Sequence, residues 1–280
     1  MDINISEWTL LSERLFSRNY ISPDQKWLMK YYTKLAAEDR AVLEQEQEIS
    51  RAVAELGIPT PKTGGVIELP DGSFGALFEN VVAKKSLSRA ASEDLSRIPE
   101  MMRRFTDLGK TIHSTHCDTK KFPAMEDLIR KNLPRAEIFT EEEIQKILAF
   151  IETVPKTDTC LHGDFHPGNF ITSPMGDYAI DLGMFSYGNP VYDWVQWYFL
   201  SHIIPAENAE RVFHMKKENV LECWKLSLQY SFGYETEEEI DRFEKSLEPF
   251  LGFSSVIYLD IIPMAKPTLL LLKEHCSLFR

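Results

Sequence analysis

The sequence has few cysteines and no uninterrupted apolar run long enough to cross a membrane. The four cysteines form no Cys-x-x-Cys pair and lie at Cys117, Cys160, Cys223 and Cys276. Such scattered positions argue against a zinc site or a disulfide framework and are typical of reduced packing thiols. The longest apolar stretch, Val256–Leu272, contains Asp260, Lys266 and two prolines. It therefore does not predict a membrane span.

Basic residues are also scarce. The chain has 31 Lys and Arg against 43 Asp and Glu, a net charge of −12. A nucleic-acid partner needs a basic face, so we expect none, and a cationic or neutral small substrate suits the charge better. The N-terminal segment MDINISEWTLLSERLF is polar and acidic and lacks a signal-peptide pattern. We expect a cytoplasmic protein without a membrane partner, either a monomer or a homodimer.

The N-terminal part of the chain mixes strand and helix patterns. Aromatic residues within Lys26–Tyr32 predict a strand, and Ala36–Leu56 predicts a helix that ends at Gly57. Two apolar runs, Val66–Leu69 and Phe74–Phe78, flank Pro-Asp-Gly-Ser and predict a hairpin. The expected unit is a small sheet with one packed helix.

The rest of the chain is mainly helical in pattern. Apolar periodicity predicts helices in Pro99–His116, Glu141–Val154, Pro190–Ile204 and most of Glu207–Phe279. Thr140 and Glu143 form a capping-box pattern. The polar stretch Ser86–Ser96 is the expected junction between two lobes. The predicted domains are a nucleotide-binding domain of residues 1–82 and a helical domain of residues 83–280 that carries the catalytic loop.

The most specific motif is LHGDFHPGNF at Leu161–Phe170, followed by AIDLG. Asp164 precedes Asn169 by five residues, and Asp181 follows a short apolar run just before a glycine. Phosphotransferases use such a set: one Asp orients the acceptor hydroxyl and takes its proton, while the Asn and the second Asp bind Mg²⁺. The motif predicts Asp164 as the catalytic base, with Asn169 and Asp181 as metal ligands.

Two histidines in this motif suggest an alternative. His162, Asp164 and His166 could ligate zinc or iron in a metallohydrolase. That account leaves Asn169 and the Asp-Leu-Gly segment without a role, so a structural His162 is preferred. A second alternative is a nucleotide-binding pseudo-enzyme with a regulatory role, because no glycine precedes Gly57 to form a phosphate-covering loop.

A lysine and a glutamate in the N-terminal part predict a phosphate-binding pair. Lys30 lies in the expected strand and is the candidate for the phosphate contact. A buried lysine needs a carboxylate partner, and Glu46 shares a helix face with Val42 and Ile49. Glu46 is therefore the predicted partner, with Glu48 as the fallback.

Other positions are assigned to the nucleotide. The segment LFENVV predicts a hinge at which the Glu79 carbonyl and the Val81 amide bind the base. The glycine-free segment Ser12–Tyr20 offers hydroxyl and guanidinium groups instead of backbone amides, with Ser17 as the candidate phosphate contact.

Three features outside the motif are interpreted as structural. Asp193 opens a helix and is expected to hydrogen-bond the catalytic loop. Trp194 and Trp197 follow in helical register and favour a core stripe over a cation-binding aromatic wall. The acidic run Glu237–Glu239 favours a solvated helix start over an attractor for a polyamine-like acceptor.

These motifs closely resemble one family. HGDFHPGNF, IDLG and YGNPVYDW are similar to the aminoglycoside phosphotransferase and choline kinase-like family of small-molecule kinases. ELGIPTPK at Glu55–Lys62 and HSTHCDTKKFP at His113–Pro123 add to the likeness, which spans Ser12 to Trp197. The C-terminal part matches only as generic helices.

The resemblance implies a two-lobed, protein-kinase-like α+β fold, with a small N-terminal antiparallel sheet plus helix and a larger helical lobe. It implies Mg²⁺-dependent transfer of the γ-phosphoryl group of ATP or GTP to a hydroxyl of a small acceptor such as an aminoglycoside, amino alcohol or sugar. It assigns the same roles as above to Asp164, Asn169, Asp181, Lys30, Glu46, Glu79 and Val81. It does not identify the acceptor.

Overall fold

The chain divides into two compact units. The computed structural model describes residues 5–13, 17–32, 40–69, 72–259 and 265–280. The first unit spans residues 1–84 and 172–183, and the second spans residues 85–171 and 184–280. The chain therefore passes between the units three times. Among the described residues, no helix is both long and apolar enough to cross a membrane.

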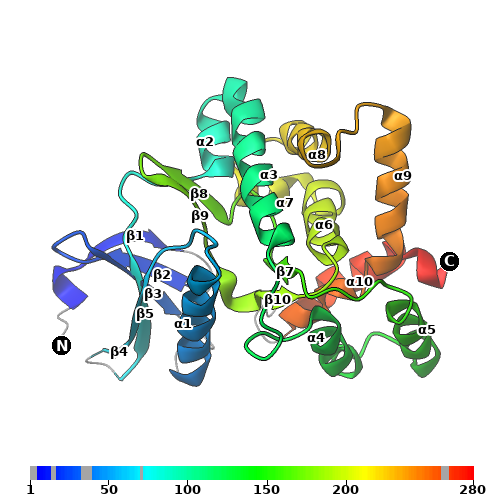
Figure 1. The fold of residues 1–280 in the computed structure, drawn as a ribbon, viewed down its shortest axis with the longest axis horizontal. Coiled ribbons are helices and arrows are strands. Elements are labelled where there is room, and N and C mark those ends of the chain that lie inside the picture. The colour runs from blue at the N-terminus through cyan, green and yellow to red at the C-terminus, as the bar shows by residue number, and fades with distance from the viewer. Residues whose placement is uncertain (1–4, 14–16, 33–39, 70–71, 260–264) are drawn as a thin grey trace. The chain divides into compact units, whose positions relative to one another are not determined.

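The first unit contains a five-stranded antiparallel sheet in the order β1-β2-β3-β5-β4 (Figure 1). Its strands are β1 (Thr9–Glu13), β2 (Ser17–Ile21), β3 (Trp27–Tyr32), β4 (Thr63–Glu68) and β5 (Phe74–Glu79). The predicted strand at Lys26–Tyr32 is confirmed as the central strand of the sheet, and the predicted hairpin is confirmed as β4 and β5.

A single helix, α1 (Arg40–Glu55), packs on β4 and β5. It confirms the predicted helix from residue 40 onward, and residues 36–39 lie outside the described part. The expected burial of Val42 is wrong, because that side chain is 47% exposed and Leu43 is buried instead. The rest of the predicted face is confirmed where it carries the argument, since Glu46, Ile49 and Val53 are buried. Gly57 follows the helix in a left-handed conformation, with φ of 83°.

The two faces of the sheet differ in character. Met29 is fully buried and packs with Leu69 and Leu77 in a small core. Side chains alternate along a strand, so the neighbouring Lys30 projects from the opposite face. The segment of residues 172–183 also belongs to this unit. It contains the end of β8 (Phe170–Ser173) and all of β9 (Gly176–Ala179), which pair with each other in a separate sheet, and the Ala179 amide donates to the Pro59 carbonyl at 2.9 Å.

The second unit is mainly helical. Its α-helices are α2 (Leu87–Glu93), α3 (Ile98–Ser114), α4 (Met125–Asn132), α5 (Glu141–Ile151), α6 (Val191–Tyr198), α7 (Ala206–Phe213), α8 (Lys217–Phe232), α9 (Glu237–Leu247) and α10 (Ala265–His275). Its short strands are β6 (Lys85–Ser86), β7 (Cys160–Leu161) and β10 (Ser186–Tyr187), of which β7 and β10 pair antiparallel.

Short helical turns complete the structure. The 3₁₀ turns are Ile5–Glu7, Leu95–Arg97, Leu133–Ala136, Leu182–Met184, Glu248–Phe250, Ser254–Tyr258 and Ser277–Phe279. The long helix predicted from Pro190 to Ile204 is α6 followed by a π-helix at Phe199–Ile203. The predicted capping box is confirmed, since Thr140 accepts from the Glu143 amide and Glu143 accepts from the Thr140 amide.

One boundary differs from expectation. Ser86–Ser96 was predicted as the junction between lobes, but it forms α2 and the start of a 3₁₀ turn. Ser86 caps α2 by accepting a hydrogen bond from the Arg89 amide. The division between the units lies just before this stretch, between Lys84 and Lys85.

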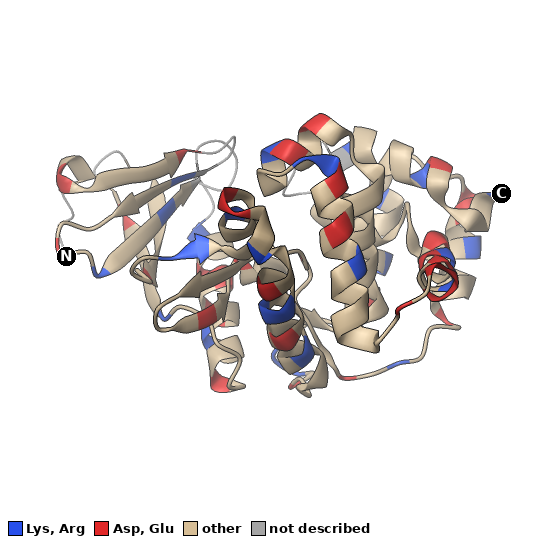
Figure 2. Ribbon diagram, turned by 90° about the horizontal axis from the view of Figure 1, so that it is seen from above, with Lys and Arg blue, Asp and Glu red and all other residues tan. Residues whose placement is uncertain are grey.

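Aromatic side chains fill the core of the second unit. Trp194 and Trp197 are both buried, and Trp197 contacts Phe105 and Phe213 edge-on. The predicted core stripe is thus confirmed. Charged residues of both signs are distributed over the helices (Figure 2). The acidic run at the start of α9 is a capped helix terminus, as predicted, in which Thr236 and Glu239 form a second capping box.

Candidate active site

The loop that follows β7 depends on one glycine. Gly163 has φ of 81°, and an added Cβ would lie 2.1 Å from the Met184 carbonyl oxygen. A side chain at this position would need both a strained backbone and a displaced neighbour. The Tyr258 hydroxyl donates to the Gly163 carbonyl from the other side. The loop is therefore confined on both sides of Gly163.

The carboxylate of Asp193 holds the backbone of this loop. The Asp193 side chain is almost fully buried in the first turn of α6. Its Oδ2 accepts from the His162 amide at 2.8 Å and from His113 Nε2 at 2.8 Å, and its Oδ1 accepts from the Gly163 amide at 2.9 Å. The predicted contact between Asp193 and the loop is confirmed. His113, whose role the sequence did not indicate, supports the same carboxylate.

The carboxylate of Asp164 accepts hydrogen bonds from two neighbouring side chains. Asn169 Nδ2 donates to Asp164 Oδ2 at 2.7 Å, and Gln196 Nε2 donates to Asp164 Oδ1 at 3.2 Å. Burial alone would raise the pKa of the Asp164 carboxyl, but the neighbouring His166 and His162 rings and the Asn169 amide together hold this pKa well below its usual range. The side chain is 31% exposed, so an ionised carboxylate remains accessible.

Asn169 is oriented by its amide group. Its Nδ2 donates to the Asp164 backbone carbonyl at 3.0 Å as well as to the Asp164 carboxylate. Nδ2 is thus the donor in both of these hydrogen bonds. The carbonyl oxygen Oδ1 has no hydrogen-bond partner among the described residues. Carboxamide and carboxylate oxygens are hard ligands of the kind that Mg²⁺ prefers. The residue is therefore suited to the metal role that the motif predicts.

The two histidines of the motif brace the loop. His162 is fully buried, and its Nδ1 accepts from the Asp164 amide at 3.3 Å. His166 Nδ1 accepts from the Gly168 amide at 3.1 Å. Within the described part of the chain, no three His, Cys, Asp or Glu side chains gather as a metal site would require. The structural reading of His162 is confirmed, and the metallohydrolase alternative gains no support.

Lys30 in the first unit is held between two carboxylates. Its Nζ donates to Glu46 Oε1 at 3.1 Å and to Asp181 Oδ1 at 2.6 Å. The predicted pairing of Lys30 with Glu46 is confirmed, and the fallback Glu48 is exposed to solvent. The contact with Asp181 was not predicted, because it joins positions 151 residues apart.

Asp181 has an unusual backbone. Its φ is 59°, in the left-handed region that residues other than glycine rarely adopt. Such conformations persist only where surrounding contacts impose them, and they concentrate at functional sites. Here Asp181 lies two residues after the end of β9 and immediately before the 3₁₀ turn Leu182–Met184. The ion pair with Lys30 is one contact that fixes its side chain.

The predicted nucleotide hinge follows β5. The backbone amide of Glu79 donates a hydrogen bond to the Lys62 carbonyl at 2.7 Å. Val81 is buried, and its amide has no hydrogen-bond acceptor within the described part of the chain. Ser17 begins β2 opposite Tyr32, and residues 14–16 of the predicted phosphate-covering segment lie outside the described residues.

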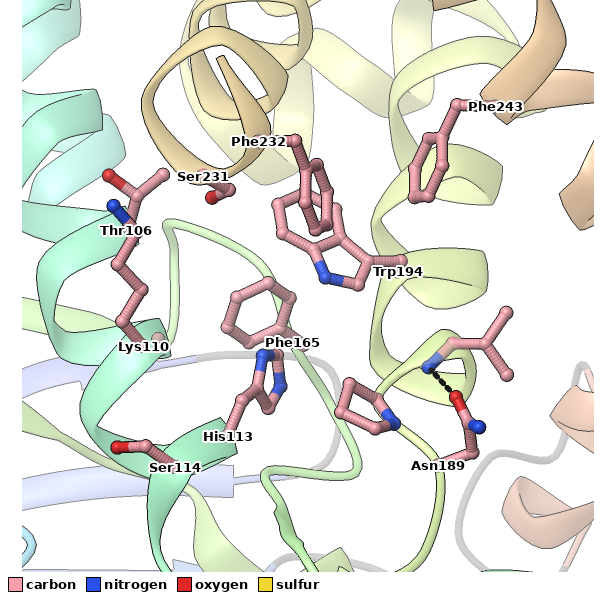
Figure 3. A pocket seen from close by; sticks show the side chains of 13 residues that line it. Thr106, Lys110, His113, Ser114, Phe165, Asn189, Trp194, Ser231, Phe232 and Phe243 are labelled. Atoms are coloured by element: carbon pink, nitrogen blue, oxygen red, sulfur yellow. Dashed lines mark hydrogen bonds between the residues drawn. The ribbon is translucent and has the colours of Figure 1, made fainter. Parts of the chain in front are cut away.

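A cavity of about 470 Å³ lies within the second unit. Figure 3 shows aromatic side chains and two basic residues around it. The residues that line the cavity include Lys110, His113, Phe165, Trp194, Phe232 and Phe243. Asp164 is not among its lining residues, although Phe165 follows it in the loop. The cavity is therefore distinct from the carboxylate that the motif identifies.

Comparison with known families decides the class of the protein. Residues 10–224 match the model of the phosphotransferase enzyme family. The chain belongs to this family. The predicted class of enzyme, a small-molecule phosphotransferase, is thereby confirmed. None of the curated proteins matches the sequence at a significant level.

Several solved structures resemble the chain at low identity. Aminoglycoside phosphotransferase APH(3'')-Id from Streptomyces rimosus is 17% identical with a TM-score of 0.53, over 86% of this chain and 92% of the other. A choline/ethanolamine kinase family protein from Mesorhizobium loti is 14% identical with a TM-score of 0.56, over 96% and 88%. The GDP and kanamycin complex of APH(2")-IIIa is 16% identical with a TM-score of 0.54, over 98% and 94%. These similarities confirm the predicted protein-kinase-like α+β fold.

Proposed function

We propose that the protein transfers the γ-phosphoryl group of ATP or GTP to a hydroxyl group of a small acceptor. The observation that carries this proposal is the partly exposed carboxylate of Asp164, held by Asn169 in a loop that Asp193 fixes. Membership of the phosphotransferase family supports the reaction class. A similar structure contains GDP and kanamycin, which supports a nucleotide donor and a hydroxyl-bearing acceptor.

Asp164 acts on the acceptor. Its carboxylate accepts a hydrogen bond from the reacting hydroxyl and orients the oxygen toward the phosphorus. Because the pKa of Asp164 is low, the carboxylate is a weak base in the ground state. We expect the proton to move to Asp164 as the new bond between oxygen and phosphorus forms. Orientation is therefore its main contribution.

Asn169 and Asp181 supply oxygen ligands for Mg²⁺. Asn169 Oδ1 is directed away from the bonds that its amide nitrogen makes, and Asp181 provides a carboxylate. When bound, Mg²⁺ would neutralise charge on the transferred phosphoryl group. Asp181 also pairs with Lys30, so a bound Mg²⁺ would share its carboxylate with the lysine, which Glu46 would continue to hold.

Lys30, Ser17, Glu79 and Val81 serve the nucleotide. Lys30 binds the α- and β-phosphates, and its hydrogen bonds to two carboxylates fix the position of its ammonium group. The Val81 amide and the Glu79 carbonyl bind the base at the end of β5. Ser17, at the start of β2, contributes to the phosphate contacts.

The acceptor carries a hydroxyl group and is an aminoglycoside, an amino alcohol or a sugar. The similar structures include aminoglycoside phosphotransferases and a choline/ethanolamine kinase family protein. The net charge of −12 favours a cationic acceptor among these classes.

The test is nucleoside diphosphate release from Mg-ATP and Mg-GTP across aminoglycosides, choline, ethanolamine, sugars and hydroxy amino acids. We expect acceptor-dependent release that falls by 10²-fold or more in Asp164→Asn, because this variant keeps the shape of the side chain but removes the base. Nucleotide affinity should stay within about threefold of the wild type, because Asp164 serves the acceptor rather than the nucleotide.

A matched control is Asp158→Asn, which neutralises an exposed carboxylate paired with His116. This variant should turn over like the wild type. The proposal fails if no member of the panel stimulates release, or if Asp164→Asn turns over at a rate close to that of Asp158→Asn. Equal loss of nucleotide binding and turnover in Asp164→Asn would contradict the role of Asp164 as the base.

A further inference from the structure

One face of α6 makes hydrogen bonds to the backbone of the catalytic loop and to the side chain of Asp164. Asp193 and Gln196 are three residues apart on this helix and therefore lie on the same face. Asp193 accepts from the backbone amides of the loop, whereas Gln196 reaches the carboxylate of Asp164. The first contact fixes where the loop runs, and the second fixes how Asp164 is turned.

The contacts of Asp164 define the orientation of Gln196. An ionised carboxylate only accepts hydrogen bonds, so the atom of Gln196 that faces Asp164 Oδ1 at 3.2 Å is Nε2. The other oxygen, Oδ2, accepts from Asn169. His166 Nε2 lies 3.7 Å from Oδ1, which is too far for a hydrogen bond. Gln196 is thus the side chain that hydrogen-bonds Oδ1 among the described residues.

The two hydrogen bonds give the two oxygens of the Asp164 carboxylate different partners. Without a donor on Oδ1, the carboxylate could rotate about its Cβ–Cγ bond and exchange the two oxygens. With Gln196 on Oδ1 and Asn169 on Oδ2, the plane of the carboxylate is fixed. The remaining lone pair of Oδ2 then points in one direction, where the acceptor hydroxyl can meet it. Small errors in such alignment reduce rates by up to about 10²-fold.

We propose that Gln196 is a positioning residue for Asp164, acting on the alignment of the acceptor hydroxyl and not on nucleotide binding. This inference rests on the proposed function of Asp164 as the base. It also assigns a role to a position that the sequence motif does not include, since Gln196 lies 32 residues after Asp164 in the chain.

Two variants separate the hydrogen bond from the size of the side chain. Gln196→Met keeps a similar length but has no donor, and Gln196→Glu keeps the shape but places a second carboxylate against Oδ1. We expect kcat to fall about tenfold or more in Gln196→Met and further in Gln196→Glu, because like charges at this distance repel. The KM for nucleotide should remain within about twofold in both variants. A packing role predicts the opposite order, with the isosteric Glu variant closest to the wild type.

The chain offers a matched control for the added charge. Gln145 on α5 also donates to a carboxylate, Glu141 Oε1 at 2.9 Å, but this pair is exposed. Gln145→Glu should leave kcat unchanged. Thermal unfolding of each variant identifies any loss of folded protein, and kcat is taken per folded molecule.

A double variant tests whether Gln196 acts through Asp164. In the Asp164→Asn background, Gln196→Met should lower the residual rate by less than twofold, because the carboxylate that it positions is already absent. An equal loss in both backgrounds overturns the inference. So does a Gln196→Met enzyme with wild-type kcat while Asp164→Asn is inactive, and in that case the proposed function stands. If Asp164→Asn itself turns over normally, the proposed function and this inference fail together.

Discussion

The buried carboxylate of Asp193 should be among the most important single groups for stability. In Asp193→Ala, the amides of His162 and Gly163 lose their acceptor while they remain buried. Each unsatisfied buried amide costs about 1–3 kcal/mol, so we expect the free energy of unfolding to fall by about 2–6 kcal/mol. The loss of the bond from His113 adds to this effect.

An isosteric variant refines the prediction. Asp193→Asn keeps one acceptor oxygen, so one of the two amides still has a partner and the expected loss is about 1–3 kcal/mol. Urea unfolding followed by tryptophan fluorescence measures both variants. The exposed Asp107→Ala on α3 is the control and should change stability by less than about 0.5 kcal/mol. A loss below about 1 kcal/mol in Asp193→Ala would mean that the amides find other acceptors, which would refute the argument.

Three further predictions concern other parts of the second unit. Gly163→Ala should destabilise the fold by about 3 kcal/mol or more, measured as a lower thermal midpoint, because its Cβ meets the Met184 carbonyl and its φ is positive. Burial lowers the pKa of His202 to about 4, so its ring is neutral in the folded protein. The free energy of unfolding should therefore be highest above about pH 6.5 and should fall by at most about 3 kcal/mol as the pH drops toward 4, since Glu244 at 3.4 Å offsets part of the effect. His202→Gln should flatten this pH dependence in urea titrations. Thr140→Ala removes half of a capping box and should lower the free energy of unfolding, measured by urea titration, by about 1 kcal/mol.

Local patterns in the sequence predicted the features that depend on neighbouring residues. The Thr140 capping box, the β4–β5 hairpin and the helix α1 all follow from spacing within a few positions. The pairing of Lys30 with Glu46 was also predictable, because a strand and the helix after it must bury their facing side chains together. The motif residues Asp164 and Asn169 are likewise close in sequence, and their side chains are hydrogen-bonded.

Features that depend on distant contacts were not predictable in the same way. In α1 the predicted face holds at Glu46, Ile49 and Val53, but near the start of the helix Leu43 is buried in place of Val42. Gln196 carries no local signal, because its contact with Asp164 requires α6 to pack against the loop. Ser86–Ser96 is polar, yet tertiary contacts and the Ser86 cap make it helical. Local polarity therefore did not decide its structure.

The division of the chain has a consequence for its synthesis. The first unit includes residues 172–183, so translation of the first 84 residues does not complete it. Lys30 emerges from the ribosome 151 residues before Asp181, which at 5–20 residues per second is a delay of about 8–30 s. During that interval all five strands of the β1–β5 sheet are already synthesised, and Glu46 is present beside Lys30 while the Asp181 carboxylate is not. Truncation before residue 172 should therefore leave the N-terminal unit without its last segment and Lys30 without its Asp181 partner.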